Sequence, residues 1–580
     1  MAGYLELRDA ESVDAPARSQ TLVRLLGVAA AVCLVLGLAP ALRGTAGGPA
    51  SLREPSGRLD GPMSMASAAA AEGPQRVNVT LTDGRMVYGT SSVHARSFVG
   101  IPYGSAGRWE EPKPSRWEGT WDATSSSTCC VQPYAHLKTT EDCLHLSIFT
   151  PPREPSELQP VLVWFFGGGF VGGGAFDFTA ESVRRLVAWH SLIVVIPDTR
   201  VGVFGYLGSN RLRANSTGNW GTLDQKLSLQ WVAEHIREFG GDPNHITIGG
   251  WSSGAASVSL FLTMPGAAPP LRGAIMMSGG FAGWSAFSLK TAEETYDALL
   301  RATACDASAD CQREGPPCAC LRALPAEALS AAQMSPEMLN WAPVIDEAVL
   351  REHPFAALEA RRRSGRPLAR EVPILIGSTL EDAFPSLREG ASDSDFAQWL
   401  RSSVPAGHRA QAYDMYMQRP DSLLSDGAHA AGISRAYWES RRAAADRGQA
   451  CVARRVARLW PEKAWQYLWQ TRFDGESTAG FGPGISHSSD QHFLFQTKVP
   501  KAWDPTARAL QKAVASFIRS SRPGAPWWPS GGGDGPVFQQ AGPVVGPIRK
   551  EQCDFWDLVV DEKEEAKKHA SGEVAGSGSE

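Results

Sequence analysis

The sequence lacks an excess of positive charge, an internal repeat and a phosphate-binding loop. Its 580 residues include 56 Lys and Arg against 61 Asp and Glu, a formal net charge of −5. Nucleic-acid-binding proteins usually carry an excess of Lys and Arg, which this chain lacks, so no nucleic-acid partner is expected. Its glycine-rich run at 167–169 is not followed by Gly-Lys-Ser or Gly-Lys-Thr, which disfavours a P-loop. What remains is a globular protein, and 43% hydrophobic with 20% charged residues fits that class.

One long apolar run lies near the N-terminus. Residues 25–42, LLGVAAAVCLVLGLAPAL, follow a segment 1–24 that contains two nearby arginines. A run of about 18 residues is short for a membrane span and long for a signal-peptide core. Two interpretations stay open, a cleaved signal peptide and an uncleaved type II membrane anchor. Both direct the chain into the secretory pathway, as a secreted protein or one with a luminal or extracellular domain.

Cysteines and glycosylation sequons agree with that compartment. One of the ten cysteines, Cys33, lies in the apolar run; the nine others are an odd number, so at least one thiol is unpaired or bonded between chains. Asn78-Val79-Thr80 and Asn215-Ser216-Thr217 are acceptor patterns for N-glycans in an oxidising lumen. The chain is therefore expected to be a glycoprotein.

The rest of the chain divides into a linker, a large domain and a tail. Residues 43–75 are rich in Gly, Ala, Ser and Pro, which predicts a flexible linker, and the charged, then small and polar residues 561–580 predict disorder. Over residues 76–560, apolar runs such as PVLVWFF, LIVVIPDT, ITIGG and VPILIGST alternate with helical stretches. This pattern predicts an α/β domain with a large, mostly parallel central sheet and helices on both faces.

The stretch ITIGGWSSGAASVSL places two serines where a predicted strand ends. Gly250-Trp251-Ser252-Ser253-Gly254 fits Gly-x-Ser-x-Gly, the turn that presents a nucleophilic serine between a strand and a helix. The glycines permit an approach of strand and helix that a Cβ would block. The same residues also fit an ordinary Ser/Gly loop, so other groups of a hydrolase site have to be found.

Candidates for those groups occur in the chain order of α/β-hydrolases, which is Ser, then acid, then His. Gly167-Gly168-Gly169 follows a predicted strand, where backbone N–H groups can face a developing oxyanion. Glu381 and Asp382 follow VPILIGST, as either a solvated turn or the acid of a triad. His487, in the loop GFGPGISHSSDQ, is the best candidate for the base, whereas His492 lies in an apolar run that favours a structural role.

With these motifs the chain resembles the type-B carboxylesterase and cholinesterase family of α/β-hydrolases. The similarity extends from about Val77 to about Trp556. Its most specific stretches are TEDCLHLSIFTP, VLVWFFGGGF, GNWGTLDQKLSLQWVAEHIREFGGDPNHITIGGWSSGAAS, APVIDEAVL and EQCDFWDLV. The resemblance implies a disulfide-bonded α/β-hydrolase fold and hydrolysis of a small-molecule carboxylic ester, with no metal and no organic cofactor. It implies no oligomeric state.

The resemblance also implies a role for each candidate residue. Ser252 would be the nucleophile, His487 the base and Asp382 the acid, with Glu381 as the fallback acid. Ser278 matches a family serine that supports the acid. The oxyanion would be held by the backbone N–H groups of Gly168, Gly169 and Ser253.

Four positions depart from the usual family pattern. The residues before and after the nucleophile are usually Glu and Ala, whereas this chain has Trp251 and Ser253. The acid is usually Glu, so Asp382 is one methylene shorter and the His487 loop must come closer. The residue after the histidine is usually Gly and is Ser488 here. Together these changes bear on rate and specificity.

The family template further implies the pairing of the cysteines. In the first implied pair, Cys130 with Cys143, the loop between the cysteines holds only 12 residues, Val131 to Asp142, and no Trp. Cholinesterases carry a choline-binding tryptophan in a longer loop. A general ester therefore fits better than a choline ester or a lipase with a long lid. Trp251, Trp284 and Trp341 either wall the pocket or belong to the core. The implied bridges are Cys130–Cys143, Cys305–Cys320, Cys311–Cys318 and Cys451–Cys553, with Cys129 as the odd thiol.

Two functions compete on this evidence. The first is a serine esterase that forms an acyl-enzyme on Ser252. The second is an adhesion or receptor ectodomain that keeps the fold without catalysis, as neuroligin-like relatives do. Such relatives commonly lack a triad residue, whereas this chain retains a candidate for every role, which favours the esterase.

Overall fold

The computed structural model describes residues 75–571, except 127, 155, 213–217, 267, 314–317, 336–337, 339–340, 419–432, 461, 472–483, 496–503, 525–527 and 540–541. The predicted segments 1–24 and 25–42, most of the predicted linker and Asn215 lie outside the described residues. Asn78 is described and exposed. Among the described helices, none has the length and apolar character needed to cross a membrane.

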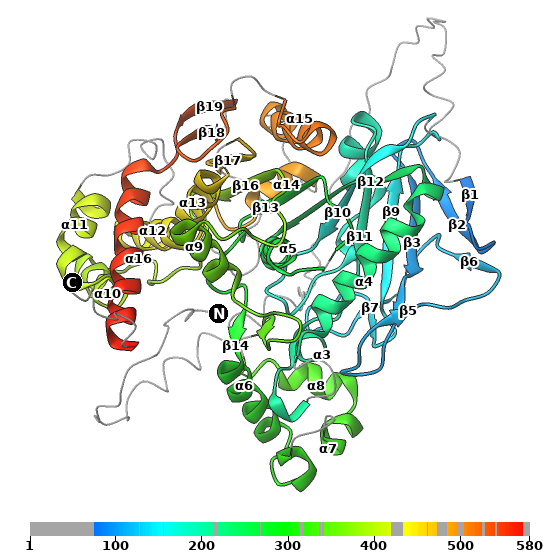
Figure 1. Cartoon of the computed structure of the whole chain (residues 1–580), viewed down its shortest axis with the longest axis horizontal. Helices are drawn as coiled ribbons and strands as arrows, with labels where there is room; N and C mark the ends of the chain where they lie inside the picture. Colours follow the sequence, from blue (N-terminus) through cyan, green and yellow to red (C-terminus); the bar gives the residue numbers. More distant parts are fainter. Residues whose placement is uncertain are drawn as a thin grey trace, which may run out of the picture. The chain divides into compact units, whose positions relative to one another are not determined.

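Thirteen of the described strands form one large mixed sheet (Figure 1). Its order is β1-β2-β3-β9-β11-β10-β12-β13-β16-β17-β18-β19, with β6 beside β2. The pairs from β11 to β18 are parallel, and the pairs outside them along that order are antiparallel. The strands are β1 Gln75–Thr80, β2 Met86–Ser91, β3 Arg96–Pro102, β6 Thr120–Asp122, β9 His145–Thr150, β10 Gln159–Phe165, β11 Ile193–Pro197, β12 Gly241–Trp251, β13 Gly273–Met277, β16 Ile374–Thr379, β17 Ala464–Trp469, β18 Asp534–Gln539 and β19 Gly542–Pro547.

Helices connect the parallel strands and cover the sheet. Three two-stranded pairs lie apart from the large sheet: β4 (Gly104–Ser105) with β5 (Lys113–Pro114), β7 (Thr128–Cys130) with β8 (Lys138–Thr140), and β14 (Phe287–Ser288) with β15 (Val344–Ile345). The α-helices are α2 Ala180–Arg184, α3 Gly202–Tyr206, α4 Trp220–His235, α5 Ser253–Thr263, α6 Leu289–Ala302, α7 Ala319–Ala323, α8 Ala326–Ala332, α9 Pro354–Ser364, α10 Asp393–Ser403, α11 Arg409–Tyr413, α12 Arg435–Ala445, α13 Cys451–Leu459, α14 Ser489–Phe495, α15 Asp504–Ser520 and α16 Lys550–Ser571.

The central strands are buried on both faces, as their unbroken apolar runs predict. In β10, Val161, Val163 and Phe165 enter one hydrophobic cluster, which also holds residues of α4, α5, α9 and α13. Leu162 and Trp164 enter a second cluster with residues of α2, α14 and α15. Because successive side chains of a strand point to opposite faces, this alternation means that helices cover both sides of the sheet. The predicted α/β-hydrolase fold class is confirmed.

Among the described residues four disulfides form, and they pair the cysteines as the family resemblance implies: Cys130–Cys143, Cys305–Cys320, Cys311–Cys318 and Cys451–Cys553. Cys129 is a buried free thiol.

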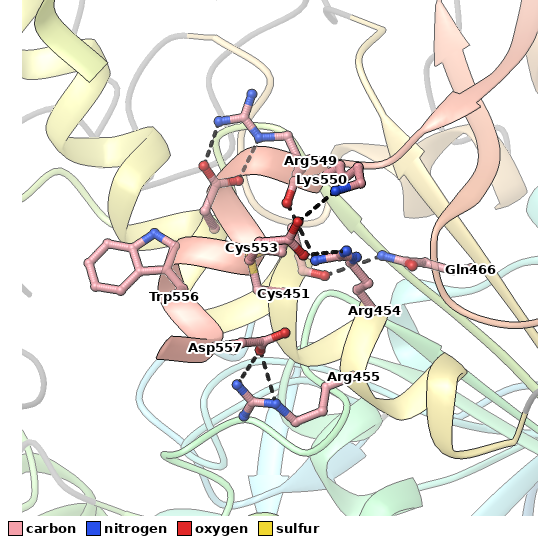
Figure 2. The surroundings of a disulfide bond; sticks show 12 residues. Cys451, Arg454, Arg455, Gln466, Arg549, Lys550, Cys553, Trp556 and Asp557 are labelled. Atoms are coloured by element: carbon pink, nitrogen blue, oxygen red, sulfur yellow. Dashed lines mark hydrogen bonds and ion pairs between the residues drawn. A yellow bond between two sulfur atoms is a disulfide. The ribbon is translucent and has the colours of Figure 1, made fainter. Parts of the chain in front are cut away.

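The longest-range disulfide fixes α16 to α13. Figure 2 shows Cys451 of α13 bonded to Cys553 of α16, with two arginines of α13 beside it. Arg454 pairs with Asp554 at 2.6 Å, and Arg455 pairs with Asp557. The two cysteines are 102 residues apart, and closing a loop of that length removes about 4–5 kcal/mol of chain entropy from the unfolded state.

The C-terminal helix extends further than the sequence pattern predicts. We expected disorder from residue 561, but α16 continues to Ser571. The run DEKEEAKKHAS is rich in Glu, Lys and Ala, which are strong helix formers. High charge density was therefore mistaken for disorder over these residues, while residues 572–580 lie outside the described part of the chain.

Candidate functional site

Ser252 occupies a strained turn between β12 and α5. Its backbone has φ 54° and ψ −125°, and its N–H donates to the carbonyl of Met277 at 2.9 Å. A side chain at Gly250 would come within 2.5 Å of the Gly254 backbone, and one at Gly254 within 2.1 Å of the Phe165 carbonyl oxygen. Only glycine fits these two positions, so the sequence pattern enforces the sharp turn. This is the geometry of a nucleophile elbow.

A continuous line of hydrogen-bonding groups joins Ser252, His487 and Asp382. The Ser252 Oγ lies 2.7 Å from Nε2 of His487, and Nδ1 of the same ring contacts Oδ1 of Asp382. All three residues are buried, with 3–7% of their surface exposed. Asp382 follows β16, and His487 precedes α14. The structure thus brings His487 together with Ser252, 235 positions away in sequence, and with Asp382, 105 positions away.

Glu381, the fallback acid, points elsewhere. One of its carboxylate oxygens accepts a hydrogen bond from the Ile485 N–H at 2.7 Å, and the other accepts from Arg442 at 2.8 Å. The Glu381 N–H also donates to the Ile485 carbonyl at 3.2 Å. Glu381 therefore ties the end of β16 to the loop that carries His487. This clamp supplies the closer approach that the shorter side chain of Asp382 requires.

The clamp is a buried ion pair whose arginine is shared with a second carboxylate. Arg442 of α12 also contacts Glu439 at 2.8 Å, and Arg442 and Glu381 are 1–2% exposed. Removing one partner of such a buried pair leaves an uncompensated charge, which typically costs about 3–5 kcal/mol. Glu381 is a structural anchor of the site, a role that its position beside Asp382 did not predict.

Ser278 does not support the acid as expected. Its hydroxyl is buried and forms no hydrogen bond with the described residues. The second oxygen of Asp382 instead accepts a hydrogen bond from the Thr379 N–H at 3.0 Å. Because aspartate is shorter than glutamate, its carboxylate is held back against the end of β16 by a backbone donor. The expectation for Ser278, which came from a family that usually has glutamate, is corrected here.

The predicted oxyanion donors lie in a glycine-rich loop and at the first residue of α5. Gly168 and Gly169 have φ of 122° and 64°, which places both in the left-handed half of the map. A Cβ on Gly168 would lie 2.2 Å from the Gly172 carbonyl oxygen. Ser253 is the first residue of α5, where helix N–H groups lack intrahelical acceptors. Their role as oxyanion donors remains a prediction of the family resemblance.

Gln132 braces the glycine loop, which sequence reasoning missed. Its side chain accepts from the Gly173 N–H at 2.7 Å and donates to the Gly173 carbonyl at 3.0 Å. It also donates to the Cys130 carbonyl at 3.2 Å. The Cys130–Cys143 bridge and the glycine loop are thus joined through one amide side chain. The only signal in the sequence is that Gln132 closely follows Cys130.

Of the three tryptophans considered for the pocket, one contacts the site directly. The Trp251 indole fills the space beside Gly167, where a Cβ would come within 2.7 Å of the ring, and its centre lies 6.3 Å from the His487 ring. Trp284 is half-buried against a small cluster that includes Phe170, from the glycine loop. Trp341 is buried in a separate core cluster with α3 and α6.

A further buried acid, Asp490, lies near the three predicted residues. It is on α14, three positions after His487, and accepts a hydrogen bond from the Tyr467 hydroxyl at 2.7 Å. Burial raises the pKa of Asp490 to about 7, and the negative charge of Asp382 adds to the rise. Nothing in the stretch SHSSDQHF marks this acid as buried, so the sequence alone does not identify it.

Asp490 makes stability depend on pH. Its folded pKa is above the ordinary value of 3.8, so from about pH 4 to pH 7 the folded chain binds more protons than the unfolded chain. This group therefore lowers stability as pH rises through that window. We therefore compare the free energy of unfolding of Asp490→Asn with that of wild type. The difference, variant minus wild type, should be about 1–3 kcal/mol more positive at pH 8 than at pH 5. Thermal melts of both proteins across this range measure the effect, and an equal difference at both pH values would contradict it.

Among the described residues, Asp310, Cys311 and Cys318 bring three possible metal-ligand atoms within 4.8 Å of one another. The two cysteines are bonded to each other, so neither offers a thiolate. This cluster is therefore a poor fit for a metal ion.

Comparisons with known proteins agree with this geometry. The family model described as "Carboxylesterase family" matches residues 76–556. Human thyroglobulin is 28% identical over 525 residues, which cover 81% of this chain and 18% of thyroglobulin. Mouse thyroglobulin is 32% identical over 366 residues, which cover 60% of this chain and 12% of the relative. The chain thus spans less than a fifth of these relatives. A solved structure of PNB esterase matches with a TM-score of 0.65 and 24% identity over 83% of this chain and 99% of that one, which shows a shared fold.

Proposed function

Because the chain belongs to the carboxylesterase family, we propose that it hydrolyses carboxylic esters through an acyl-enzyme on Ser252. The observation that carries the proposal is the 2.7 Å contact between the Ser252 hydroxyl and the His487 imidazole, whose other nitrogen contacts Asp382. A nucleophile, a base and an orienting acid in this order are the parts of a serine hydrolase. Their burial supports the proposal further, because charge stabilisation is stronger away from water.

In the first half of the reaction Ser252 becomes acylated. Its Oγ attacks the ester carbonyl carbon while Nε2 of His487 takes the hydroxyl proton. The carbonyl oxygen becomes an oxyanion that accepts hydrogen bonds from the N–H groups of Gly168, Gly169 and Ser253. Asp382 holds the imidazole in the required tautomer and stabilises the imidazolium. The bond to the leaving oxygen then breaks, and the proton on His487 passes to that oxygen, so the alcohol leaves.

In the second half water removes the acyl group. His487 takes a proton from the water, whose oxygen attacks the acyl carbon and forms a second oxyanion in the same hole. The bond to Ser252 Oγ breaks, the proton returns to Ser252, and the carboxylic acid leaves. Each group ends in its starting state, and the cycle uses only the ester and water.

The compartment of this activity is part of the proposal. Four disulfides support a secretory-pathway protein, since such bonds persist in oxidising environments. Whether the protein is released or anchored through residues 25–42 depends on a segment outside the described residues. The substrate class is a small carboxylic ester, because the short Cys130–Cys143 loop leaves no room for a long lid.

A second candidate is a non-catalytic binding domain. It is favoured by the thyroglobulin matches, whose name, unlike that of PNB esterase, denotes no enzymatic activity. The departures at Trp251, Ser253 and Ser488 from the usual family residues are compatible with this candidate.

A fluorophosphonate probe separates the two candidates. Such probes phosphonylate a serine only where a neighbouring base and an oxyanion hole activate it. We expect the full-length protein to be labelled on the peptide that contains Ser252, and Ser252→Ala to remain unlabelled, as read by mass spectrometry of the digest. A folded wild-type protein that takes up no label would favour the binding domain.

A further inference from the structure

One side of α15 carries a row of positive charges. Leu510, Val514 and Phe517 face the second hydrophobic cluster. Arg508, Lys512 and Arg519 are exposed, and at 100° per residue they fall within about 40° of one another around the helix. They span about 16 Å along it at 1.5 Å per residue. Arg522, just beyond the helix, is also exposed. We name Arg508, Lys512, Arg519 and Arg522 the α15 basic face.

The neighbouring turn Arg185–Trp189, labelled η2, holds this face in place. Trp189 is 51% exposed, and the guanidinium carbons of Arg185 and Arg508 lie 4.7 and 5.4 Å from its ring centre. Arg519 donates to the carbonyl of His190. These contacts fix the directions of the cations without neutralising them, because an indole ring and a carbonyl are uncharged acceptors.

The carboxylates nearby balance only part of this charge. Asp504 contacts both Arg185 and Arg508, so those three groups sum to one positive charge. Over the described residues, no carboxylate forms an ion pair with Lys512, Arg519 or Arg522. The pKa of His190 is lowered by burial and then by the charges of Arg519 and Lys512. A local positive field therefore exists on a chain whose formal net charge is −5.

The C-terminal end of the face, which carries Arg519, is remote from the proposed catalytic site. At the C-terminal end of α15, the Ile518 carbonyl oxygen lies 2.9 Å from Nε2 of His245, near the start of β12. Ser252 follows the last residue of that same strand. Ser252 is seven positions after His245 along the chain, or about 23 Å at 3.3 Å per residue of strand. An occupant at this end of the basic face can therefore bind without covering Ser252.

We propose that the α15 basic face binds a linear polyanion, specifically a sulfated polysaccharide chain. The cations are arranged in a row, which matches a chain with repeated anionic groups, and multipoint contact releases counterions. A lipid surface fits less well, because the apolar side of α15 is already buried in the core and cannot insert into a bilayer. The four disulfides favour a partner outside the cytosol, where sulfated polysaccharides occur. The proposal does not depend on ester hydrolysis.

Binding to immobilised heparin, used as the probe, tests the proposal. We expect the full-length protein to be retained at about 0.15 M NaCl, where exposed charges interact over about 8 Å, and to elute as salt rises. The triple variant Arg508→Glu/Lys512→Glu/Arg519→Glu should lose retention, with an affinity for soluble heparin at least about tenfold weaker and a shallower salt dependence. Melting temperature confirms that the variant is folded.

A matched control separates a specific face from net charge. The variant Lys290→Glu/Arg351→Glu/Arg388→Glu changes the charge by the same amount at exposed positions outside α15, and it should elute like wild type. Equal loss of binding in both variants, or no retention of wild type, would overturn the proposal. Sedimentation with phosphatidylserine vesicles is the third arm. Binding to vesicles without binding to heparin would replace the polysaccharide with a lipid surface.

Discussion

Replacing Ser252 with alanine is expected to lower kcat for p-nitrophenyl butyrate by about 10⁴–10⁶-fold. The reason is that the hydroxyl of Ser252 contacts Nε2 of His487, which places it to form the proposed acyl-enzyme. KM should change far less than kcat, because the substitution leaves the proposed oxyanion donors unchanged. The measurement is steady-state hydrolysis followed by p-nitrophenolate absorbance, with the purified full-length protein.

The adjacent serine provides a close control. Ser253 is expected to act through its backbone N–H, which alanine keeps, and the family usually has alanine at this position. Ser253→Ala should therefore retain activity within about tenfold of wild type. Equal rates for wild type and Ser252→Ala would show that Ser252 is not the nucleophile. Loss of activity in Ser253→Ala alone would move the nucleophile by one residue.

The second large effect is expected at the acid. Asp382→Asn should lower kcat by about 10³–10⁴-fold, because a neutral amide cannot stabilise the imidazolium of His487 and can hold the ring in the wrong tautomer. Thermal stability should change little, since asparagine can still accept the hydrogen bond from the Thr379 N–H. The assay is the same ester hydrolysis, together with a melting curve.

Glu381→Gln separates the acid from its neighbour. Glutamine keeps the acceptor for the Ile485 N–H but removes the charge that faces Arg442. We expect a smaller loss of kcat, about 10–100-fold, because the His487 loop loosens, and a lower melting temperature, because Arg442 is left undercompensated. The reverse pattern, in which only Glu381→Gln abolishes turnover, would contradict the assignment of Asp382.

The sequence predicted the parts of the fold that depend on local patterns. Unbroken apolar runs such as PVLVWFF identified buried parallel strands, because both faces of each strand must be apolar. The glycines around Ser252 identified the sharp turn, because only glycine fits there. The chain order of Ser252, Asp382 and His487, read with the family resemblance, was enough to select three residues whose side chains contact one another in the structure.

Other parts of the site depend on contacts between distant segments, which local patterns do not encode. Glu381 and Asp382 are adjacent and alike in sequence, and only the fold shows that Glu381 pairs with Arg442 of α12 while Asp382 contacts the His487 ring. Gln132 and Asp490 are ordinary polar residues until folding buries them beside the glycine loop and the histidine. The template misplaced the support for the acid at Ser278 because it assumes a glutamate.

The Cys451–Cys553 bridge encloses His487 within a covalent ring, because the histidine lies between the two cysteines along the chain. A protease that cuts the backbone once inside this ring produces two fragments that remain attached. On a denaturing gel the nicked protein should migrate as a single species until a reductant is added. Such a cut alone cannot release the segment that carries the proposed base.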